Sequence, residues 1–148
     1  MEQIADVIIT PLKRILGDKG HVFHGIKKSD PGFKAFGEAY FSTVNYQVIK
    51  GWKKHFEMTL NLVVPQGAIR FVIFDDREKS PTKGVFQTVL ASPENYCRLT
   101  VPPEIWMAFQ GVDNGVNLLM NLADMEHAPD EQINLPLDDP KFSQYVWK

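Results

Sequence analysis

Short apolar or alternating runs, separated by residues that favour turns, recur along most of the chain. Nine such runs cover residues 7–10, 22–26, 39–44, 48–52, 58–64, 69–74, 85–90, 97–101 and 117–123. Turn signals lie between many of them, such as Pro-Gln-Gly at 65–67 and Gly-Val-Asp-Asn-Gly at 111–115. Strands of this length at this spacing are typical of an antiparallel sandwich or barrel. We therefore expect an all-β fold.

Only two short helices are expected, both peripheral. The first covers 29–36, because an aspartate followed by proline suits a helix start and Gly37 can end it. The second follows Pro140 into Tyr145. The sequence has no internal repeat, low-complexity tract or linker, so residues 1–148 are expected to form a single domain.

Composition excludes several classes of protein. Sixteen basic and eighteen acidic side chains give a net charge of -2, which provides no positive field for nucleic acid. Cys97 is the only cysteine, which excludes a disulfide framework and a thiolate zinc site and fits a reducing compartment. No apolar run approaches the length of a membrane span. We expect a soluble, cytoplasmic, unprocessed protein with neither nucleic acid nor membrane as a partner.

Residues 50–67 resemble the first cupin motif, in which a glycine precedes two histidines one residue apart, then an acid and a closing glycine. Lys53 and His55 occupy the histidine pair, and Leu60 occupies the position of the acid. Met107 stands where the second motif has its histidine. One ordinary ligand remains among four positions, so neither a metal nor any other cofactor is expected.

Three longer stretches carry a resemblance to a known family. They are Gly67 to Gly84 with its Asp-Asp-Arg and Ser-Pro-Thr-Lys-Gly segments, Lys50-Gly51-Trp52-Lys53, and Val101 to Phe109; weaker matches are Asp18-Lys19-Gly20 with Phe23, and Asp139-Pro140 with Trp147. From residue 9 to residue 147 the chain thereby resembles the dTDP-4-dehydrorhamnose 3,5-epimerase family. The resemblance implies a double-stranded β-helix (a cupin or jelly-roll barrel) with few short helices, and a homodimer.

The resemblance also implies a mechanism with a histidine base, a tyrosine acid on the opposite face of the sugar, and cationic groups that stabilise an enolate. In this chain the base position is Lys53, and the tyrosine position falls at about Asn121. The lysine inside the family's barrel reads Leu60. The aspartate with which the family orients its histidine would lie beyond Lys148.

Lys53 and His55 lie two residues apart on an expected strand, so their side chains should project to the same side. His55 can serve as a base for a proton next to a ketone. Lys53 can supply the cation for the enolate oxygen, or act as the base if burial lowers its pKa. The alternative is that Lys53 reaches solvent and His55 is a structural histidine of the barrel.

Nucleotide-sugar binding needs cationic groups at the diphosphate and an apolar shelf for the base. By resemblance, charge and position the candidates are Lys19, Phe23, His24, Lys50, Arg70 and Met107. Asp75, Asp76 and Arg77 are interpreted as an ion-paired turn at a strand end. His127, which no motif covers, is interpreted as a surface or packing residue.

The sequence thus predicts an isomerase: an epimerase or keto-isomerase of a 4-keto-6-deoxy nucleotide sugar. It would act by metal-free proton abstraction and enolisation, in surface polysaccharide (O-antigen or lipopolysaccharide) biosynthesis. The alternative is a non-catalytic relative that keeps the fold and the nucleotide-sugar site. A metal-dependent cupin enzyme is disfavoured by the missing ligands.

Overall fold

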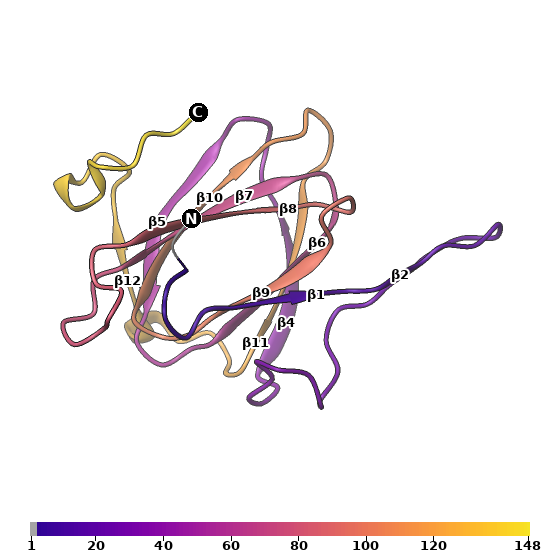
Figure 1. Ribbon diagram of the computed structural model, residues 1–148, viewed down its shortest axis with the longest axis horizontal. Helices are drawn as coiled ribbons and strands as arrows, with labels where there is room; N and C mark the ends of the chain where they lie inside the picture. Colours follow the sequence, from indigo (N-terminus) through magenta and orange to yellow (C-terminus); the bar gives the residue numbers. More distant parts are fainter. Residues whose placement is uncertain (1–2) are drawn as a thin grey trace.

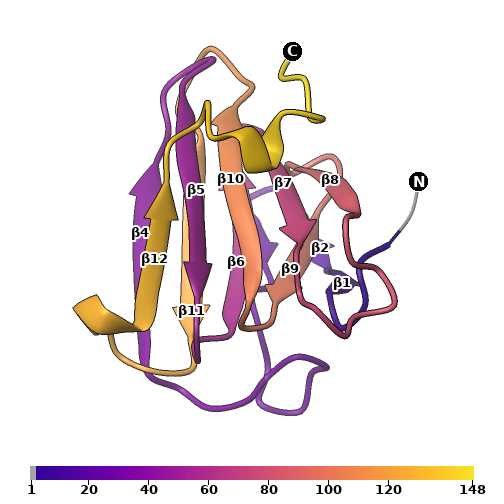
Figure 2. The same cartoon turned by 90° about the vertical axis from the view of Figure 1, so that its left-hand side faces the viewer.

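The computed structural model describes residues 3–148, and these form two five-stranded antiparallel sheets that face each other (Figures 1 and 2). The first sheet has the order β1 (Ile8–Pro11), β9 (Cys97–Val101), β6 (Leu60–Gln66), β11 (Leu118–Ala123) and β4 (Glu38–Thr43). The second has the order β12 (Gln132–Leu135), β5 (Ile49–His55), β10 (Ile105–Gly111), β7 (Ile69–Asp75) and β8 (Phe86–Ala91). The predicted all-β jelly-roll barrel is confirmed.

Each of the nine expected runs overlaps a strand, and the run 97–101 is β9 without change. The sequence does not predict β10, because its residues are apolar in succession rather than in alternation. β10 lies between β5 and β7 and is almost wholly buried, so both of its faces are covered and the period of two is lost. β12 is likewise not predicted, since it is a four-residue edge strand with exposed side chains.

The helix expected at 29–36 is wrong: these residues form turns and an irregular segment. The segment crosses the outer face of the first sheet, where the buried guanidinium of Arg98 donates to the carbonyl oxygens of Gly25 and Pro31 at 2.9 and 2.8 Å. Gly32 has a φ of +88°, and a Cβ there would lie 2.5 Å from the Thr100 hydroxyl oxygen. Tertiary contacts therefore override the local helix signal.

The second expected helix shrinks to one 3-10 turn, η2 (Pro140–Phe142), and a similar turn, η1 (Pro129–Glu131), precedes β12. Aromatic side chains of η2 and of the residues after it pack on the outer face of the second sheet. Phe142 stacks on Trp52 with ring centroids 4.0 Å apart and meets Trp106 edge-on. None of the described helices is long and apolar enough to cross a membrane.

A two-stranded hairpin, β2 (Arg14–Ile15) with β3 (Val22–Phe23), extends away from the barrel (Figure 1). It carries the exposed apolar side chains Ile15, Leu16 and Val22. The hairpin therefore presents a surface that the rest of its own chain does not cover.

The ion-paired turn expected after β7 is present. The fully buried carboxylate of Asp75 accepts hydrogen bonds from Arg77 Nε at 2.9 Å and from the Ser80 and Thr82 hydroxyls at 2.6 Å each. Burial alone would raise the pKa of Asp75, but these hydrogen bonds lower it well below its usual value. The ionised carboxylate fixes the path of the chain from β7 to β8.

Asp75→Asn should lower the free energy of unfolding by about 3 kcal/mol. The amide carries no charge, and its NH₂ group would face the hydrogen-bond donors that the carboxylate now accepts from. Because the folded pKa is depressed, the contribution of Asp75 is present above the unfolded pKa of about 3.9 and is lost as the pH falls below it. Urea unfolding at pH 7 and pH 3 measures both effects. The variant should therefore lose less stability on acidification than the parent.

Asp6→Asn is the matched control, since Asp6 contacts the same guanidinium from a 70% exposed position. It should cost less than about 1 kcal/mol. Equal losses from the two variants would contradict the role given to Asp75.

Candidate active site

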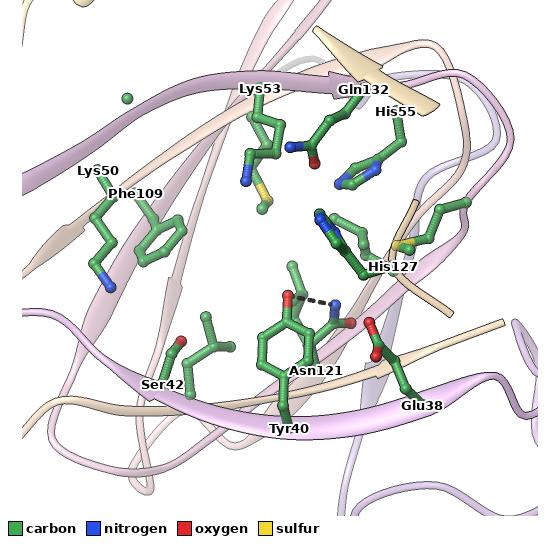
Figure 3. Close-up of a pocket in the computed structure, with 16 residues that line it drawn as sticks. Glu38, Tyr40, Ser42, Lys50, Lys53, His55, Phe109, Asn121, His127 and Gln132 are labelled. Atoms are coloured by element: carbon green, nitrogen blue, oxygen red, sulfur yellow. Dashed lines mark hydrogen bonds between the residues drawn. The ribbon is translucent and has the colours of Figure 1, made fainter. Parts of the chain in front are cut away.

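A cavity of about 450 Å³ opens between the inner faces of the two sheets (Figure 3). Its floor is apolar and its rim is polar. The floor residues are Met58, Leu60, Leu62, Met107 and Leu119. The polar and aromatic residues are Glu38, Tyr40, Ser42, Lys50, Lys53, His55, Phe109, Asn121, His127 and Gln132. Such a concave site with a few converging polar groups suits a small polar ligand with an apolar part.

β5 supplies one wall of this cavity through the alternation of its side chains. Lys53 and His55 face inward, whereas Trp52 enters the outer aromatic cluster and Lys54 reaches Asp76 at 3.4 Å. Lys53 has no hydrogen-bond or ion-pair partner within residues 3–148. A lysine whose ammonium group is not otherwise engaged is thus available to a bound molecule.

His55 is held by a buried carboxylate. Its Nδ1 lies 2.6 Å from Glu131 Oε1, and the other oxygen of Glu131 accepts the backbone N–H groups of Glu57 and Met58 at 3.0 and 2.9 Å. Burial raises the pKa of Glu131, but the hydrogen bonds from His55 and the two amides lower it below its ordinary value. An ionised carboxylate only accepts hydrogen bonds, so Nδ1 of His55 carries the shared proton, and Nε2 has no hydrogen-bond partner within residues 3–148.

Sequence reasoning missed Glu131 because it lies 76 residues from His55. Only strand pairing unites them: Gln132 of β12 stands opposite His55 of β5, which places the preceding residue beside the imidazole. The single available signal is an acidic residue just ahead of a short apolar-alternating segment, and many other acids in the chain share it.

The opposite wall holds an amide and a phenol. Asn121 of β11 is buried, and its Oδ1 accepts the backbone N–H of Asn61 at 3.2 Å. Its Nδ2 donates to the hydroxyl oxygen of Tyr40 at 3.1 Å, across the pairing of β11 with β4 (Figure 3). Tyr40 was not singled out from the sequence, although it lies in the expected strand 39–44. In the observed strand β4, Glu38, Tyr40 and Ser42 lie two residues apart and share one face.

Two further residues define the ends of the cavity. Lys50 donates to the carbonyl oxygen of Thr43 at 2.8 Å and lies 5.9 Å from the centre of the Phe109 ring. At the other end His127 enters from the connection between β11 and β12 (Figure 3). Its side chain is exposed, as expected for a surface residue, and it also lines the cavity.

The six candidates for nucleotide-sugar binding lie in three places. Lys50 and Met107 line the cavity. Lys19, Phe23 and His24 belong to the projecting hairpin and its base, where Phe23 packs on Tyr96 and His24 lines a separate hollow. Arg70 binds Gln110 Oε1 at 2.9 Å and also lies outside the cavity. Four of the six binding candidates therefore lie outside the cavity of their own chain.

The floor places Leu60 and Met107 where a metal-binding cupin would have ligands. Within residues 3–148 no three His, Cys, Asp or Glu side chains cluster closely enough to hold a metal ion. The polar groups at the rim are nitrogens, hydroxyls and a carboxylate from β4, β5, β11, β12 and the connection between β11 and β12. Groups of these types can exchange protons with a ligand and bind its oxygen atoms.

Comparison with known proteins identifies the family of this chain. Residues 2–147 match the family described as dTDP-4-dehydrorhamnose 3,5-epimerase, so the chain belongs to this family of sugar isomerases. A probable low-salt glycan biosynthesis epimerase, Agl13 of Haloferax volcanii, is 30% identical over 139 residues, which are 90% of this chain and 89% of the relative.

Solved structures extend the comparison. A dTDP sugar isomerase from Desulfovibrio desulfuricans G20 superposes with a TM-score of 0.90 at 36% identity, over 93% of this chain and 88% of that chain. An epimerase from Mycobacterium tuberculosis shares the fold, with a TM-score of 0.86 at 17% identity over 99% of this chain and 76% of the other. The resemblance seen in the sequence is confirmed, as are the fold class and the isomerase class.

Glu131→Gln should lower the free energy of unfolding by about 1–3 kcal/mol, because the amide cannot accept all three hydrogen bonds with the strength of a carboxylate. It should also release His55 from a single tautomer. Urea unfolding and ¹⁵N NMR of the imidazole measure the two effects.

Asp130→Asn alters the exposed neighbour of Glu131 and should change neither quantity. Should the Gln variant keep both the stability and the Nδ1-protonated signature of the parent, the carboxylate would not be what orients His55.

Proposed function

We propose that this protein epimerises or isomerises a 4-keto-6-deoxy nucleotide sugar by metal-free proton abstraction and enolisation. The observation that carries the proposal is a carboxylate-held imidazole and a phenol on opposite walls of one cavity, His55 with Glu131 on one side and Tyr40 on the other. Inversion at carbon requires a base on one face of the sugar and an acid on the other. Family membership supports the choice of a dTDP-linked sugar.

The first step belongs to the β5 wall. Nε2 of His55 takes a proton from a carbon next to the ketone, and Glu131 stabilises the imidazolium that forms. The electron pair of the broken C–H bond moves onto the ketone oxygen, giving an enolate. The ammonium group of Lys53, which the protein leaves unpaired, stabilises this negative charge.

The second step belongs to the opposite wall. The Tyr40 hydroxyl delivers a proton to the other face of the same carbon, which restores the ketone with inverted configuration. Asn121 supports this step because its amide donates to the phenol oxygen and stabilises the phenolate left behind. The role assigned to Asn121 is thus to position and stabilise, and Tyr40 carries the proton.

Proton exchange tests this assignment directly. The protein is incubated with dTDP-4-keto-6-deoxyglucose in deuterated water, and deuterium at C3 and C5 is followed by NMR. We expect exchange, reduced about 10²-fold or more in His55→Asn and in Tyr40→Phe, and reduced in Lys53→Met. Tyr46→Phe is a matched control, because Tyr46 lies outside the cavity.

Absence of deuterium uptake with every nucleotide tried would overturn the enolisation proposal. It would favour the alternative, a non-catalytic protein that binds a nucleotide sugar. The apolar Leu60 and Met107, which stand where the resemblance implies a lysine and a histidine, are the observation behind this alternative. Calorimetric binding of dTDP to the exchange-inactive protein would then identify it as a binding protein.

We further propose a homodimer in which each hairpin serves the cavity of its partner. Lys19 and Phe23 lie on a hairpin that projects from the barrel and cannot line the cavity of its own chain (Figure 1). Uncovered apolar residues on the hairpin support contact with a second copy. Lys19 and Lys50 would then bind the diphosphate from two chains.

Light scattering at micromolar concentration should show a dimer, and a monomer would contradict this proposal. Mixing tests the shared site. A Lys53→Met/His55→Asn protein and a Lys19→Ala/Phe23→Ala protein should each be nearly inactive, yet regain exchange when their subunits are allowed to reassort. No regain from two well-folded dimers would place the hairpin outside the site.

The biological setting is also part of the proposal. The name of the Haloferax volcanii relative refers to glycan biosynthesis. By this likeness we propose a role in making a deoxysugar for a surface polysaccharide, in the cytoplasm. Metabolite analysis of a deletion strain should show loss of one deoxysugar from surface glycans and accumulation of its 4-keto precursor.

A further inference from the structure

The connection between β11 and β12 is fastened at both ends to the turn between β5 and β6. At its start, Asp124 Oδ1 accepts the backbone N–H of Thr59 at 2.9 Å. At its end, Glu131 accepts the N–H groups of Glu57 and Met58, and its own carbonyl oxygen accepts the N–H of Phe56 at 2.8 Å. Two carboxylates thus satisfy successive amides of one turn, and residues 124–131 are held against it.

A third contact fixes the same connection to the entry of β4. The N–H of Gly37 donates to the carbonyl oxygen of Ala123 at 2.8 Å. The two segments approach so closely that a Cβ on Gly37 would lie 2.2 Å from the Met125 backbone. Only glycine allows this contact, which holds the connection beside the cavity.

His127 is presented from the middle of this connection. Figure 3 shows its ring inside the cavity, between His55 on one wall and Asn121 with Glu38 on the other. In the described part of the chain neither ring nitrogen has a hydrogen-bond or ion-pair partner. By contrast His55 is bound to Glu131, and His21 accepts the N–H of Gly17. Among residues 3–148 no hydrogen bond or ion pair explains why this imidazole lies in the cavity.

We propose that His127 is a third acid–base group of this cavity, which contacts the bound sugar and exchanges a proton with it. The proposal rests on the function proposed above. The neutral ring accepts a proton from the sugar through one nitrogen and later returns it, so no co-reactant is consumed. His127 comes from the connection between β11 and β12, so its imidazole would contact the sugar from a third element, besides β5 and β4.

Imidazole is the side chain best suited to exchange protons near neutral pH. Other titratable groups near the ring also affect the pH dependence. They are Glu38 and Tyr40 on β4, Lys53 and His55 on β5, and Asp124, Glu126, Asp130 and Glu131 on the connection itself. A variant must therefore be compared with a neighbour on the same connection, which separates loss of the imidazole from a change in local charge.

The test compares His127→Gln with Glu126→Gln, an exposed neighbour that the cavity does not include. Deuterium exchange into dTDP-4-keto-6-deoxyglucose is measured from pH 5 to pH 9. His127→Gln should lower exchange about 10²-fold and remove one ionisation from the pH profile, whereas Glu126→Gln should keep both.

Binding gives an independent readout. The chain has four histidines, so their imidazole resonances can be assigned by single variants. The His127 resonance should shift on addition of dTDP-4-keto-6-deoxyglucose and shift much less with dTDP alone, which lacks the sugar. A structural histidine outside the sugar site would not distinguish the two ligands.

The outcomes separate this inference from the proposed function. Exchange that is unchanged in His127→Gln, in rate and pH profile, overturns the inference and leaves the proposed function standing. A sugar-dependent shift of His127 without exchange in the parent overturns the proposed function and also the proton transfer, leaving His127 as a sugar contact. Neither exchange nor a shift overturns both.

Discussion

The carboxylate of Glu131 is the interaction on which the organisation of the cavity depends. One oxygen holds the imidazole of His55, and the other accepts two amides of the turn after β5. The same residue ends the connection that carries His127. Removing water from a charged group raises its free energy, and here hydrogen bonds from three donors offset that increase. A buried, fully hydrogen-bonded carboxylate thus joins the β5 wall, the turn beneath it and the end of the cavity into one unit.

The second sheet is stabilised from outside as well as from within. Trp52 alternates with Lys53 along β5, so the strand that offers a lysine to the cavity presents an indole to the outer face. Phe142 covers that indole, and Trp106 donates to Asp76 at 2.8 Å nearby. Packing of this kind restricts β5 to one position, which a site built from alternating side chains requires. The C-terminal segment therefore contributes to the site without lining it.

Two polar groups at or beside the cavity, the phenol of Tyr40 and the carboxylate of Glu131, come from positions that family motifs do not mark. At about the family's tyrosine position stands Asn121, and a phenol enters from the neighbouring strand, since Tyr40 is paired with Asn121 in the β4–β11 register. Likewise a glutamate ahead of β12 lies where it can orient His55, one strand away from the lysine at the base position. Side chains directly opposite each other on neighbouring strands lie close together. A motif comparison that follows one strand at a time does not show such neighbours.

The sequence by itself determined the β class, most strand positions, the shared face of Lys53 and His55, and the family, because alternation and motif spacing are local properties of the chain. It did not determine β10, whose burial on both faces erases alternation, or the turns at 29–36, which the buried Arg98 imposes. Nor did it place Tyr40 and His127 in one cavity with His55, exclude Lys19 and Arg70 from that cavity, or set Glu131 against the imidazole. Those relations depend on strand register and on connections between distant segments, and only the folded chain brings the segments together.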